Sequence, residues 1–354
     1  MAGKNQHHVW QMIQRGFSYK EFNADQIWVY EKGKIARRTQ PKNHGSENHF
    51  YGEVGSLVDQ KLTDLENELS ELVHLARNSE CGSSLEGADT KKLISLLVMR
   101  SLSLRDQLKE LSHTVFKELS RFGKEERIFK DLMLAYIKQN PDFGKDMVPM
   151  LLQDGRSEEQ AKDLIVSAAN YHIERQTTDF AADSLNIIDL ILRSIPEFAM
   201  KVHMTALERD FLNSELLDKF EGMSFSVQRA EVGSFVLPDT GVVFLDNESA
   251  YSFPDGLRHP SEVIIPLSSS VLVVGAKSKS ERRSIKTIRR LLAGCAHKTF
   301  IAPIRTAELE RVSSLIGKNS RLGIMRTAKR YCRLETMLDE GKLTSSASAT
   351  PARA

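Results

Sequence analysis

Apolar residues recur at alternating steps of four and three in the first third of the chain, the spacing that places side chains on one face of an α-helix. One series predicts a helix over residues 58–76, and the next predicts a helix over residues 90–111 with Thr90 as a candidate N-cap. We expect both series to form a core or a seam against a partner helix. Their members are Val58, Leu62, Leu65, Leu69, Leu72 and Ala76, then Leu93, Ile94, Leu97, Leu104, Leu108 and Leu111.

Two further helices are predicted beyond this pair. Ser157-Glu158-Glu159-Gln160 has the form of a capping box and predicts a helix that runs to about Arg175. Pro196 predicts another helix close to its first turn, because the fixed φ of proline suits that position. The middle of the chain is therefore expected to be a large helical region.

The pattern changes after Gly222 to short β-branched runs separated by Pro, Gly, Asp and Asn, which predicts a small sheet. Residues 26–39 near the N-terminus similarly predict two short strands about a turn at Gly33, and this hairpin is expected to complete the sheet. The fold class is therefore α+β: a large central helical region with a small mixed or antiparallel sheet formed by the N-terminal hairpin and residues of about 225–302. The C-terminal runs are 235–237, 242–245, 263–265 and 271–274.

These patterns divide the chain into five segments. Residues 1–56 hold the histidines and the hairpin, residues 57–222 the helices, and residues 223–302 a β-rich region that packs with the N-terminus. Residues 303–342 are expected to form basic C-terminal helices. Residues 343–354 have almost nothing to bury and are expected to be a disordered tail.

Composition restricts the class of protein. A chain of 354 residues that is 41% hydrophobic and 27% charged can bury a substantial core. Its three cysteines, Cys81, Cys295 and Cys332, are odd in number and far apart, which argues against a disulfide framework or a four-thiolate zinc site. No apolar run approaches the roughly 20 residues that cross a bilayer, and the opening segment is neither a secretory signal nor a transit peptide. We therefore expect a cytoplasmic protein without a membrane partner.

The net charge of +2 hides a strong asymmetry. Sixteen Lys and Arg against three Glu give residues 276–333 a formal charge of +13, and residues 334–354 carry −1, so residues 1–275 carry −10. Clustered basic groups favour phosphate contacts and fast association with nucleic acid. The same groups are equally suited to dock on the acidic remainder of their own chain or on another subunit, so both interpretations stay open.

Most of this basic section has a helical pattern. Ser280-Glu281 is a candidate start for one helix, whose apolar side holds Ile285, Ile288, Leu291, Leu292 and Cys295. A second basic helix is predicted through Arg321 and Arg333. The candidate nucleic-acid contacts on the two helices are Arg282, Lys286, Arg289, Arg290, Arg326, Lys329 and Arg330.

The order of motifs near the N-terminus points to a family. His7-His8-Val9 is followed by Ile27-Trp28-Val29-Tyr30, by the basic strand ending at Thr39, and by an acidic-aromatic block from Glu47 to Tyr51. This order resembles an uncharacterised, mainly bacterial family, domain of unknown function forty-two thirty-eight, whose members open with His-His/Tyr-Val-Pro. The resemblance covers roughly residues 5 to 302. It implies a fold neighbourhood but no nameable activity.

The resemblance also implies a set of shared polar positions. Glu66 falls where the family has a Glu on its first long helix, and Arg100 to Arg105 fall on an Arg-Thr-Pro-x-x-Arg block. Asp239 lies in the segment that the family tends to write Ile-Thr-Ser-Asp-Asn-Pro. The remaining family-aligned polar residues are Asn43, Glu47 and Tyr51.

His8 is the leading candidate for chemistry. Adjacent histidines face opposite sides of a strand and diverge by about 100° on a helix, so only one of His7 and His8 is expected in a given pocket. An imidazole there can act as a general base or metal ligand, or it can be buried and bonded to backbone as an anchor for the N-terminus. Arg15 lies seven residues on and is a candidate to bind an anion or to pair with Glu47 or Asp239.

Two arginines raise a similar choice. Arg100 and Arg105 would diverge by about 140° on one helix, and a buried arginine must be paired, with Glu66 as the natural partner of Arg100. Alternatively, Arg100 presents its donors to a phosphate or carboxylate. Asp239 sits between Pro238 and Gly241, where a carboxylate either caps the turn or binds a metal.

Two functional hypotheses follow. The first is a binding module whose basic C-terminal section contacts nucleic acid, a second copy or a protein partner, in a bacterial stress or anti-phage system that the family's distribution implies. The alternative is a nuclease-like or phosphodiesterase-like hydrolase: His8, Glu47 and Asp239 hold a divalent metal, His8 acts as base, and Arg15 and Arg100 stabilise negative charge. The sequence leaves open whether the protein is an enzyme. We expect His8, Arg15, Glu47, Arg100 and Asp239 to surround one cleft.

Overall fold

The computed structural model describes residues 5–124, 148–152, 155–175, 195, 197, 199–208, 214–246, 249–253, 259–278 and 283–320. The chain forms two compact units. Unit 1 comprises Met1–Leu111 and Phe198–Ala354, and unit 2 comprises Ser112–Glu197. The helical region expected over residues 57–222 therefore contributes to both units.

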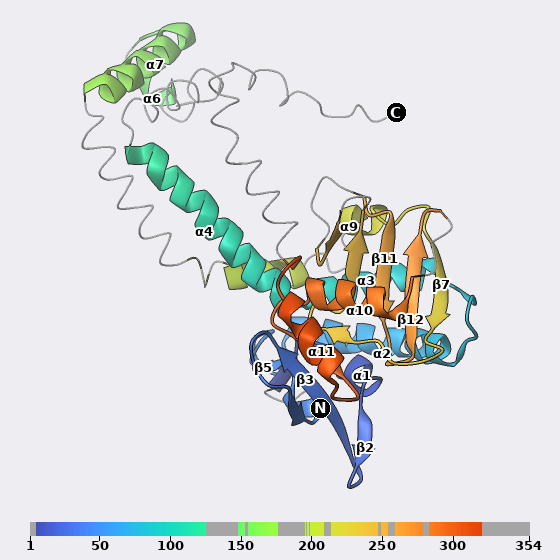
Figure 1. Cartoon of the computed structure of the whole chain (residues 1–354). Helices are drawn as coiled ribbons and strands as arrows, with labels where there is room; N and C mark the ends of the chain where they lie inside the picture. Colours follow the sequence, from blue (N-terminus) through green and yellow to red (C-terminus); the bar gives the residue numbers. More distant parts are fainter. Residues whose placement is uncertain are drawn as a thin grey trace. The chain divides into compact units, whose positions relative to one another are not determined.

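Unit 1 contains a six-stranded antiparallel sheet (Figure 1). Its central strands come from the β-branched runs of the C-terminal half, and they are buried along most of their length because both faces of the sheet are covered. In spatial order the strands are β10 (Ala250–Tyr251), β9 (Val243–Leu245), β11 (Glu262–Pro266), β12 (Val271–Ala276), β7 (Ser224–Arg229) and β6 (Ser84–Leu85).

A second sheet in unit 1 joins the N-terminal hairpin to the C-terminal half of the chain. Strand β3 pairs with β13, and Tyr30 lies opposite Phe300 with the two rings stacked 4.7 Å apart. The expected α+β class is confirmed, although the strands are distributed over two larger sheets instead of one. In spatial order the second sheet contains β2 (Tyr19–Glu21), β3 (Ala24–Glu31), β13 (Thr299–Ala302) and β8 (Leu237–Pro238), with β4 (Arg37–Thr39) also paired to β3.

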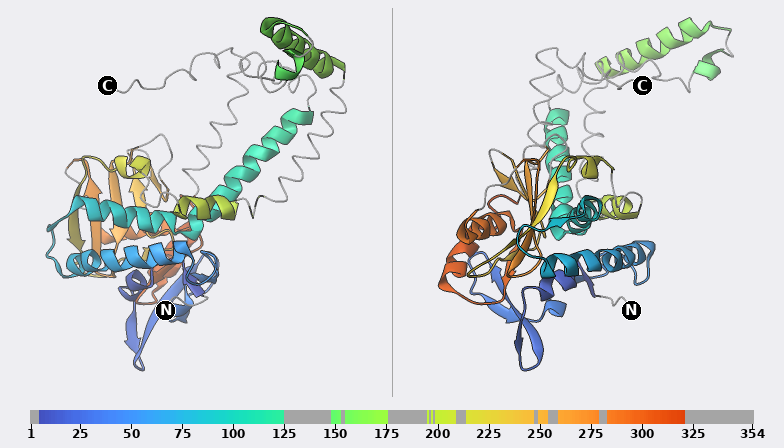
Figure 2. Two further views of the ribbon diagram at one scale, coloured as in Figure 1. Left: turned by 180° about the vertical axis from the view of Figure 1, so that it is seen from behind. Right: turned by 90° about the vertical axis from the view of Figure 1, so that its right-hand side faces the viewer.

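Helices cover both faces of the six-stranded sheet. α2 (Leu57–Asn78) and α3 (Gly87–Met99) lie on one face, and α10 (Ile285–Cys295) lies on the other (Figure 2). The predicted apolar stripe of α2 is buried, as its spacing requires. α10 begins at Ile285, where the Ser284 hydroxyl accepts the Thr287 N–H, so the expected start at Ser280-Glu281 was too early.

The helix expected over residues 90–111 is in fact two helices. α3 ends at Met99, and α4 (Leu102–Lys124) starts after a break at Arg100-Ser101. The Ser101 hydroxyl accepts the Leu104 N–H and donates to the Val98 carbonyl, at 3.2 and 2.9 Å, which ends one helix and caps the next. Glu86, not Thr90, is the N-cap of α3.

Shorter elements complete unit 1. A two-stranded ribbon of β1 (Asn5–His7) and β5 (Ser46–Asn48) brings the first histidines beside the acidic-aromatic block, and residues 199–208 are helical. The other short elements are α1 (Gln11–Arg15), η1 (Pro41–Asn43), α9 (Ser214–Asp218), α11 (Ala307–Val312) and η3 (Ser313–Leu315).

Unit 2 is helical where the structure describes it. It contains the second part of α4, then α6 (Val148–Leu152) and α7 (Glu158–Arg175), with Val148, Ala161 and Ile165 in a small core. The predicted capping box of α7 is confirmed: the Ser157 N–H donates to Gln160 Oε1 at 3.0 Å, and the Gln160 N–H donates to Ser157 Oγ at 3.2 Å.

Several expectations fall on residues outside the described ones. These are the helix start at Pro196, the second basic helix, the tail over residues 343–354, and the candidate contacts Arg282, Arg326, Lys329 and Arg330. Within the described ranges, no helix has the length and apolar character needed to span a membrane. Cys81 and Cys295 are free thiols.

Candidate functional site

Several of the predicted polar residues meet in unit 1 around the ring of Phe50, which is 2% exposed. The imidazoles of His8 and His203 lie 5.3 and 6.0 Å from the Phe50 ring, centroid to centroid, and Tyr51 packs edge-on at 4.7 Å. The Arg105 guanidinium lies over the same ring at 4.1 Å. We name this group, together with Glu47, Glu66 and Arg100, the Phe50 cluster.

Local backbone geometry explains how His8 reaches this position. β1 pairs with β5, and the Gly45 carbonyl, just before β5, accepts the N–H groups of His8 at 2.8 Å and Val9 at 3.1 Å. Gly45 has φ of 63°, and a Cβ there would lie 2.8 Å from the Cβ of Val9. Only glycine suits this turn.

The charges of the Phe50 cluster pair with one another. Arg100, 3% exposed, forms an ion pair with Glu66 and donates to the His7 carbonyl. The Tyr51 hydroxyl donates to the Arg100 carbonyl at 3.0 Å. The expected ion pair between Arg100 and Glu66 is therefore present, and it lies at the break between α3 and α4.

Arg105 and Glu47 form the second ion pair of the cluster, with 2.6 Å between Nη2 and Oε2. Arg105 lies on α4 and Glu47 on β5, so the pair links the N-terminal ribbon to this helix. Both guanidinium groups are thus engaged by carboxylates of the fold.

Burial also controls protonation in the cluster. Burial, followed by the neighbouring His44 and Arg100, lowers the pKa of His8 to about 3. Burial, followed by Arg37, lowers the pKa of His44 to about 4. Burial raises the pKa of Tyr51 to about 12, so its hydroxyl stays protonated. His8 is thus neutral at pH 7 and a weak base, whereas general-base catalysis works best with a pKa near the working pH.

The Asp239 carboxylate binds backbone N–H groups. It is 6% exposed, and its carboxylate accepts the N–H groups of His297, Lys298 and Thr299 at 2.7, 2.7 and 2.9 Å. Burial raises the pKa of Asp239, while His297 and these N–H donors oppose the shift. The three bonds fix the segment that leads into β13.

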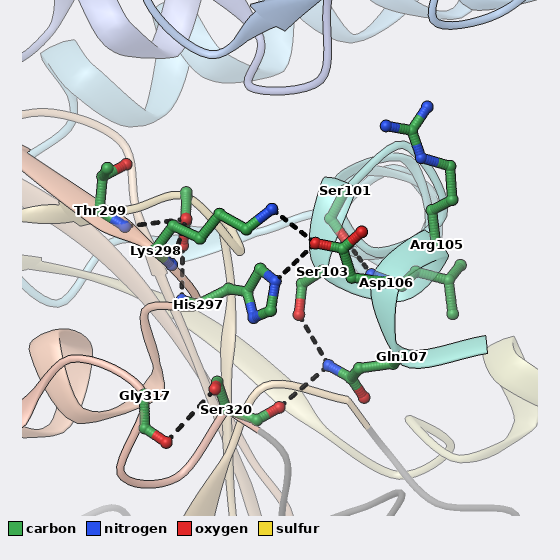
Figure 3. Close-up of polar contacts among 12 residues, drawn as sticks. Ser101, Ser103, Arg105, Asp106, Gln107, His297, Lys298, Thr299, Gly317 and Ser320 are labelled. Carbon is green, nitrogen blue, oxygen red and sulfur yellow. Dashed lines mark hydrogen bonds and ion pairs between the residues drawn. The ribbon is translucent and has the colours of Figure 1, made fainter. Parts of the chain in front are cut away.

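The same segment is also held by a side chain of α4 (Figure 3). Asp106 Oδ2 accepts from His297 Nε2 at 2.9 Å and from Lys298 Nζ at 2.6 Å. Burial opposes the ionisation of Asp106, but the hydrogen bonds from His297 and Lys298 prevail and lower its pKa. The neighbouring Gln107 amide donates to Ser320 O at 2.9 Å, so α4 is tied to two C-terminal segments.

A divalent metal does not fit the residues predicted to bind it. Glu47 is paired with Arg105, and the Asp239 carboxylate is occupied by three N–H groups. Across the described parts of the chain, no three His, Cys, Asp or Glu side chains are grouped so as to hold a metal ion. The side chains of His8, Glu47 and Asp239 therefore form no such group.

Two other predicted residues lie at the surface. Arg15 is exposed and donates to Gln11 Oε1 at 3.1 Å. Asn43 is exposed at the end of η1. Asp239 accepts the Thr299 N–H, and the Thr299 Oγ1 lies 3.4 Å from Nε2 of His44. The structure thus gathers His8, Glu47, Tyr51, Glu66, Arg100 and Arg105, and leaves Arg15 and Asn43 outside that group.

A concave basic site lies elsewhere in unit 1, on α10, α11 and η3. This pocket, which we name the α10–α11 pocket, has a volume of about 550 Å³. Lys286 and Arg290 reach it from successive turns of α10, and Arg311 reaches it from α11. The other lining residues are Glu308, Val312, Ser314 and Leu315.

Arg289, also a predicted nucleic-acid contact, is engaged within the fold. Its Nε donates to Ser234 O at 2.6 Å, and its Nη1 lies 3.2 Å from Glu308 Oε2. Glu308 is therefore neutralised by Arg289. In the described part of the chain, Lys286, Arg290 and Arg311 form no ion pair with a carboxylate, and Lys286 and Arg290 are exposed.

Sequence reasoning missed His44, His203, Asp106 and His297 as members of polar networks. Asp106 and His297 are separated by 191 positions, and no periodicity relates such residues. Arg311 belongs to the basic section by composition, but only the packing of α11 against α10 places it beside Lys286.

Comparisons with known proteins give one match. The family described as "Protein of unknown function (DUF4238)" matches residues 5–327. Searches of curated proteins and of solved structures returned no match.

Proposed function

The chain belongs to the DUF4238 family, described as proteins of unknown function, and on the basis of its α10–α11 pocket we propose that it is a binding module for nucleic-acid phosphates. The observation that carries this proposal is the convergence of Lys286, Arg290 and Arg311 on one concave site. Side-chain cations available to solvent bind phosphate oxygens, and arginine does so through a planar fork of donors. The charge of the basic section, residues 276–333, favours contact with nucleic acid, and the proposed function assigns that contact to three of its residues.

The competing idea is that the basic section docks on the acidic remainder of its own chain. Arg283 and Lys298 behave in this way, since they form ion pairs with Glu262 and Asp106. The three pocket cations do not, because no described carboxylate pairs with them. Their charges are available to an external anion, which supports binding.

A hydrolase centred on His8 receives less support. Its imidazole is 8% exposed with a pKa of about 3, and the proposed metal ligands are engaged by other groups. The residues that line the α10–α11 pocket include neither His8 nor Asp239. Binding, rather than catalysis, is the function that the described geometry supports best.

Charge reversal in the pocket tests the proposal. In the full chain, the triple variant Lys286→Glu, Arg290→Glu, Arg311→Glu should weaken duplex DNA binding by more than about 100-fold at low salt, since three phosphate contacts become repulsive. The slope of log K against log salt should fall in magnitude by about 2.7, because each neutralised phosphate contributes about 0.9. Fluorescence anisotropy over a salt series measures both quantities.

The control variant reverses three exposed basic residues that do not line the pocket: Arg15→Glu, Lys32→Glu, Lys42→Glu. It changes the net charge by the same amount, so it separates a local contact from the general field of the protein. Equal loss of affinity in the two triple variants, or undiminished affinity in the pocket variant, would overturn the proposal.

A further inference from the structure

The α10–α11 pocket has features that suit the end of a phosphorylated molecule better than a continuous strand. Resting on the proposed function, we infer that it recognises a phosphomonoester, such as that of a nucleotide or of a phosphorylated strand end. The shape, the charge and the lining of the pocket each contribute to this inference.

Shape is the first argument. A volume of about 550 Å³ lies within the range of pockets for discrete ligands, about 300–1,000 Å³. Val312 and Leu315 give the pocket an apolar lining. The exposed Lys286, Arg290 and Arg311 can contact the backbone phosphates of a duplex, whereas a concave site can in addition enclose a phosphate that ends a molecule.

Charge is the second argument. A phosphomonoester carries about −1.5 to −2 charges near pH 7, whereas each diester phosphate carries about −1. Lys286, Arg290 and Arg311 converge on the pocket, and the charge of Glu308 is offset by Arg289 at 3.2 Å. Three cations in one site match a dianion with several acceptor oxygens better than they match a single diester charge.

The lining supplies the third argument. None of the residues that line the pocket is aromatic, so bases have no platform on which to stack, unlike the usual sites for single strands. The Ser314 hydroxyl donates to the Arg311 carbonyl at 2.7 Å, which leaves its lone pairs to accept from a sugar hydroxyl. Recognition should therefore depend on phosphate and sugar and be nearly independent of the base.

The experiment compares matched ligands with the full chain. Adenosine monophosphate, adenosine and cytidine monophosphate are each titrated into the protein, and calorimetry measures their affinities. ³¹P NMR of the two nucleotides follows the phosphate directly. A short single strand with a 5′-phosphate is compared with the same strand ending in a 5′-hydroxyl. Competition by adenosine monophosphate against the labelled phosphorylated strand tells whether nucleotide and strand end use one site.

We expect each phosphorylated ligand to bind at least about 10-fold more tightly than its unphosphorylated counterpart, because charge-assisted hydrogen bonds contribute about 1.5–3 kcal/mol. The two mononucleotides should differ by less than about threefold, since no base-specific group lines the site. Arg290→Gln and Arg311→Gln should each remove most of the preference, and Arg15→Gln should leave it intact.

The possible failures are distinct. If both strands bind equally and the pocket triple variant loses both, the end-recognition inference is wrong and the proposed nucleic-acid function stands. If no strand binds but adenosine monophosphate does, in a manner that Arg290→Gln abolishes, the nucleic-acid function fails and the phosphomonoester site stands. Absence of pocket-dependent binding to any phosphorylated ligand overturns both.

Discussion

The Phe50 cluster and the α10–α11 pocket both contain arginines, but those of the cluster are paired with carboxylates and, among the described residues, Arg290 and Arg311 of the pocket are not. In the cluster, Arg100 and Arg105 are paired with Glu66 and Glu47, and Arg105 also lies over the Phe50 ring. In the pocket, Arg290 and the other cations have no carboxylate partner among the described residues, and the one carboxylate that lines it pairs with Arg289. Residue type alone therefore does not tell which arginines pair within the fold.

Water accounts for the difference. A buried charge without a partner costs several kcal/mol, so the fold tolerates Arg100 only with its charge paired, here with Glu66. An exposed cation loses little by remaining unpaired, because solvent stabilises it until an anion arrives. The comparison predicts that variants in the cluster change stability and that variants in the pocket change binding.

The largest effect is expected from Glu66→Ala, which leaves Arg100 buried without its carboxylate. We expect a loss of about 3–5 kcal/mol in the free energy of unfolding. Chemical denaturation followed by tryptophan fluorescence measures it, since both tryptophans, Trp10 and Trp28, lie in unit 1.

Glu68→Ala is the matched control for this prediction. Glu68 lies on the same helix but is half exposed, and it forms an ion pair with Lys92 on α3. Its removal should cost less than about 1 kcal/mol, as for other surface pairs. The comparison breaks if the two variants are equally stable, or if Glu66→Ala abolishes phosphate binding in molecules that remain folded.

Lowering the pH should produce the next largest change in the free energy of unfolding. The pKa values of His8 and His44 are about 3 and about 4 in the fold, below the ordinary 6.5 of a free imidazole. Above pH 6.5 both imidazoles are neutral in the folded and in the unfolded chain, and their contribution to the free energy of unfolding is fully present. As the pH falls below 6.5, the unfolded chain takes up protons first, so the free energy of unfolding declines until the pH reaches the pKa values of the folded state. Each histidine contributes a slope of up to about 1.4 kcal/mol per pH unit.

His8→Ala tests this slope. The variant should be less stable than the wild type at about pH 7 but should lose less further stability by about pH 5, because one titrating group is gone. Urea denaturation at the two pH values measures the change, and His74→Gln, at an exposed position on α2, serves as control. A slope that His8→Ala leaves unaltered would contradict the assignment of His8 as a buried neutral imidazole.

The smallest change in stability is expected in the pocket. Lys286→Ala and Arg290→Ala remove exposed cations with no described partner, so the free energy of unfolding should change by less than about 0.5 kcal/mol. Affinity for phosphorylated ligands should nevertheless fall. Loss of more than about 1 kcal/mol would show that these residues pair within the protein, as the docking hypothesis requires, and would remove the contrast between the two regions.

Local patterns in the sequence were sufficient for much of the secondary structure. The stripe of α2, the capping box before α7 and the β-branched runs of β9, β11 and β12 all appeared as expected, since each depends on neighbours a few residues apart. The motif order near His8 likewise sufficed to indicate the family that residues 5–327 match.

Tertiary structure alone decided which polar residues serve the fold and which are available to a ligand. Whether Asp239 meets a metal or three backbone N–H groups depends on where the segment at residues 297–299 returns, and the partner of Arg105 depends on how β5 packs beside α4. Likewise, Lys286 and Arg311 share a pocket because α11 folds back on α10. The charge on a side chain is determined by its residue type, but its cost and its availability depend on burial and on partners that are distant in sequence.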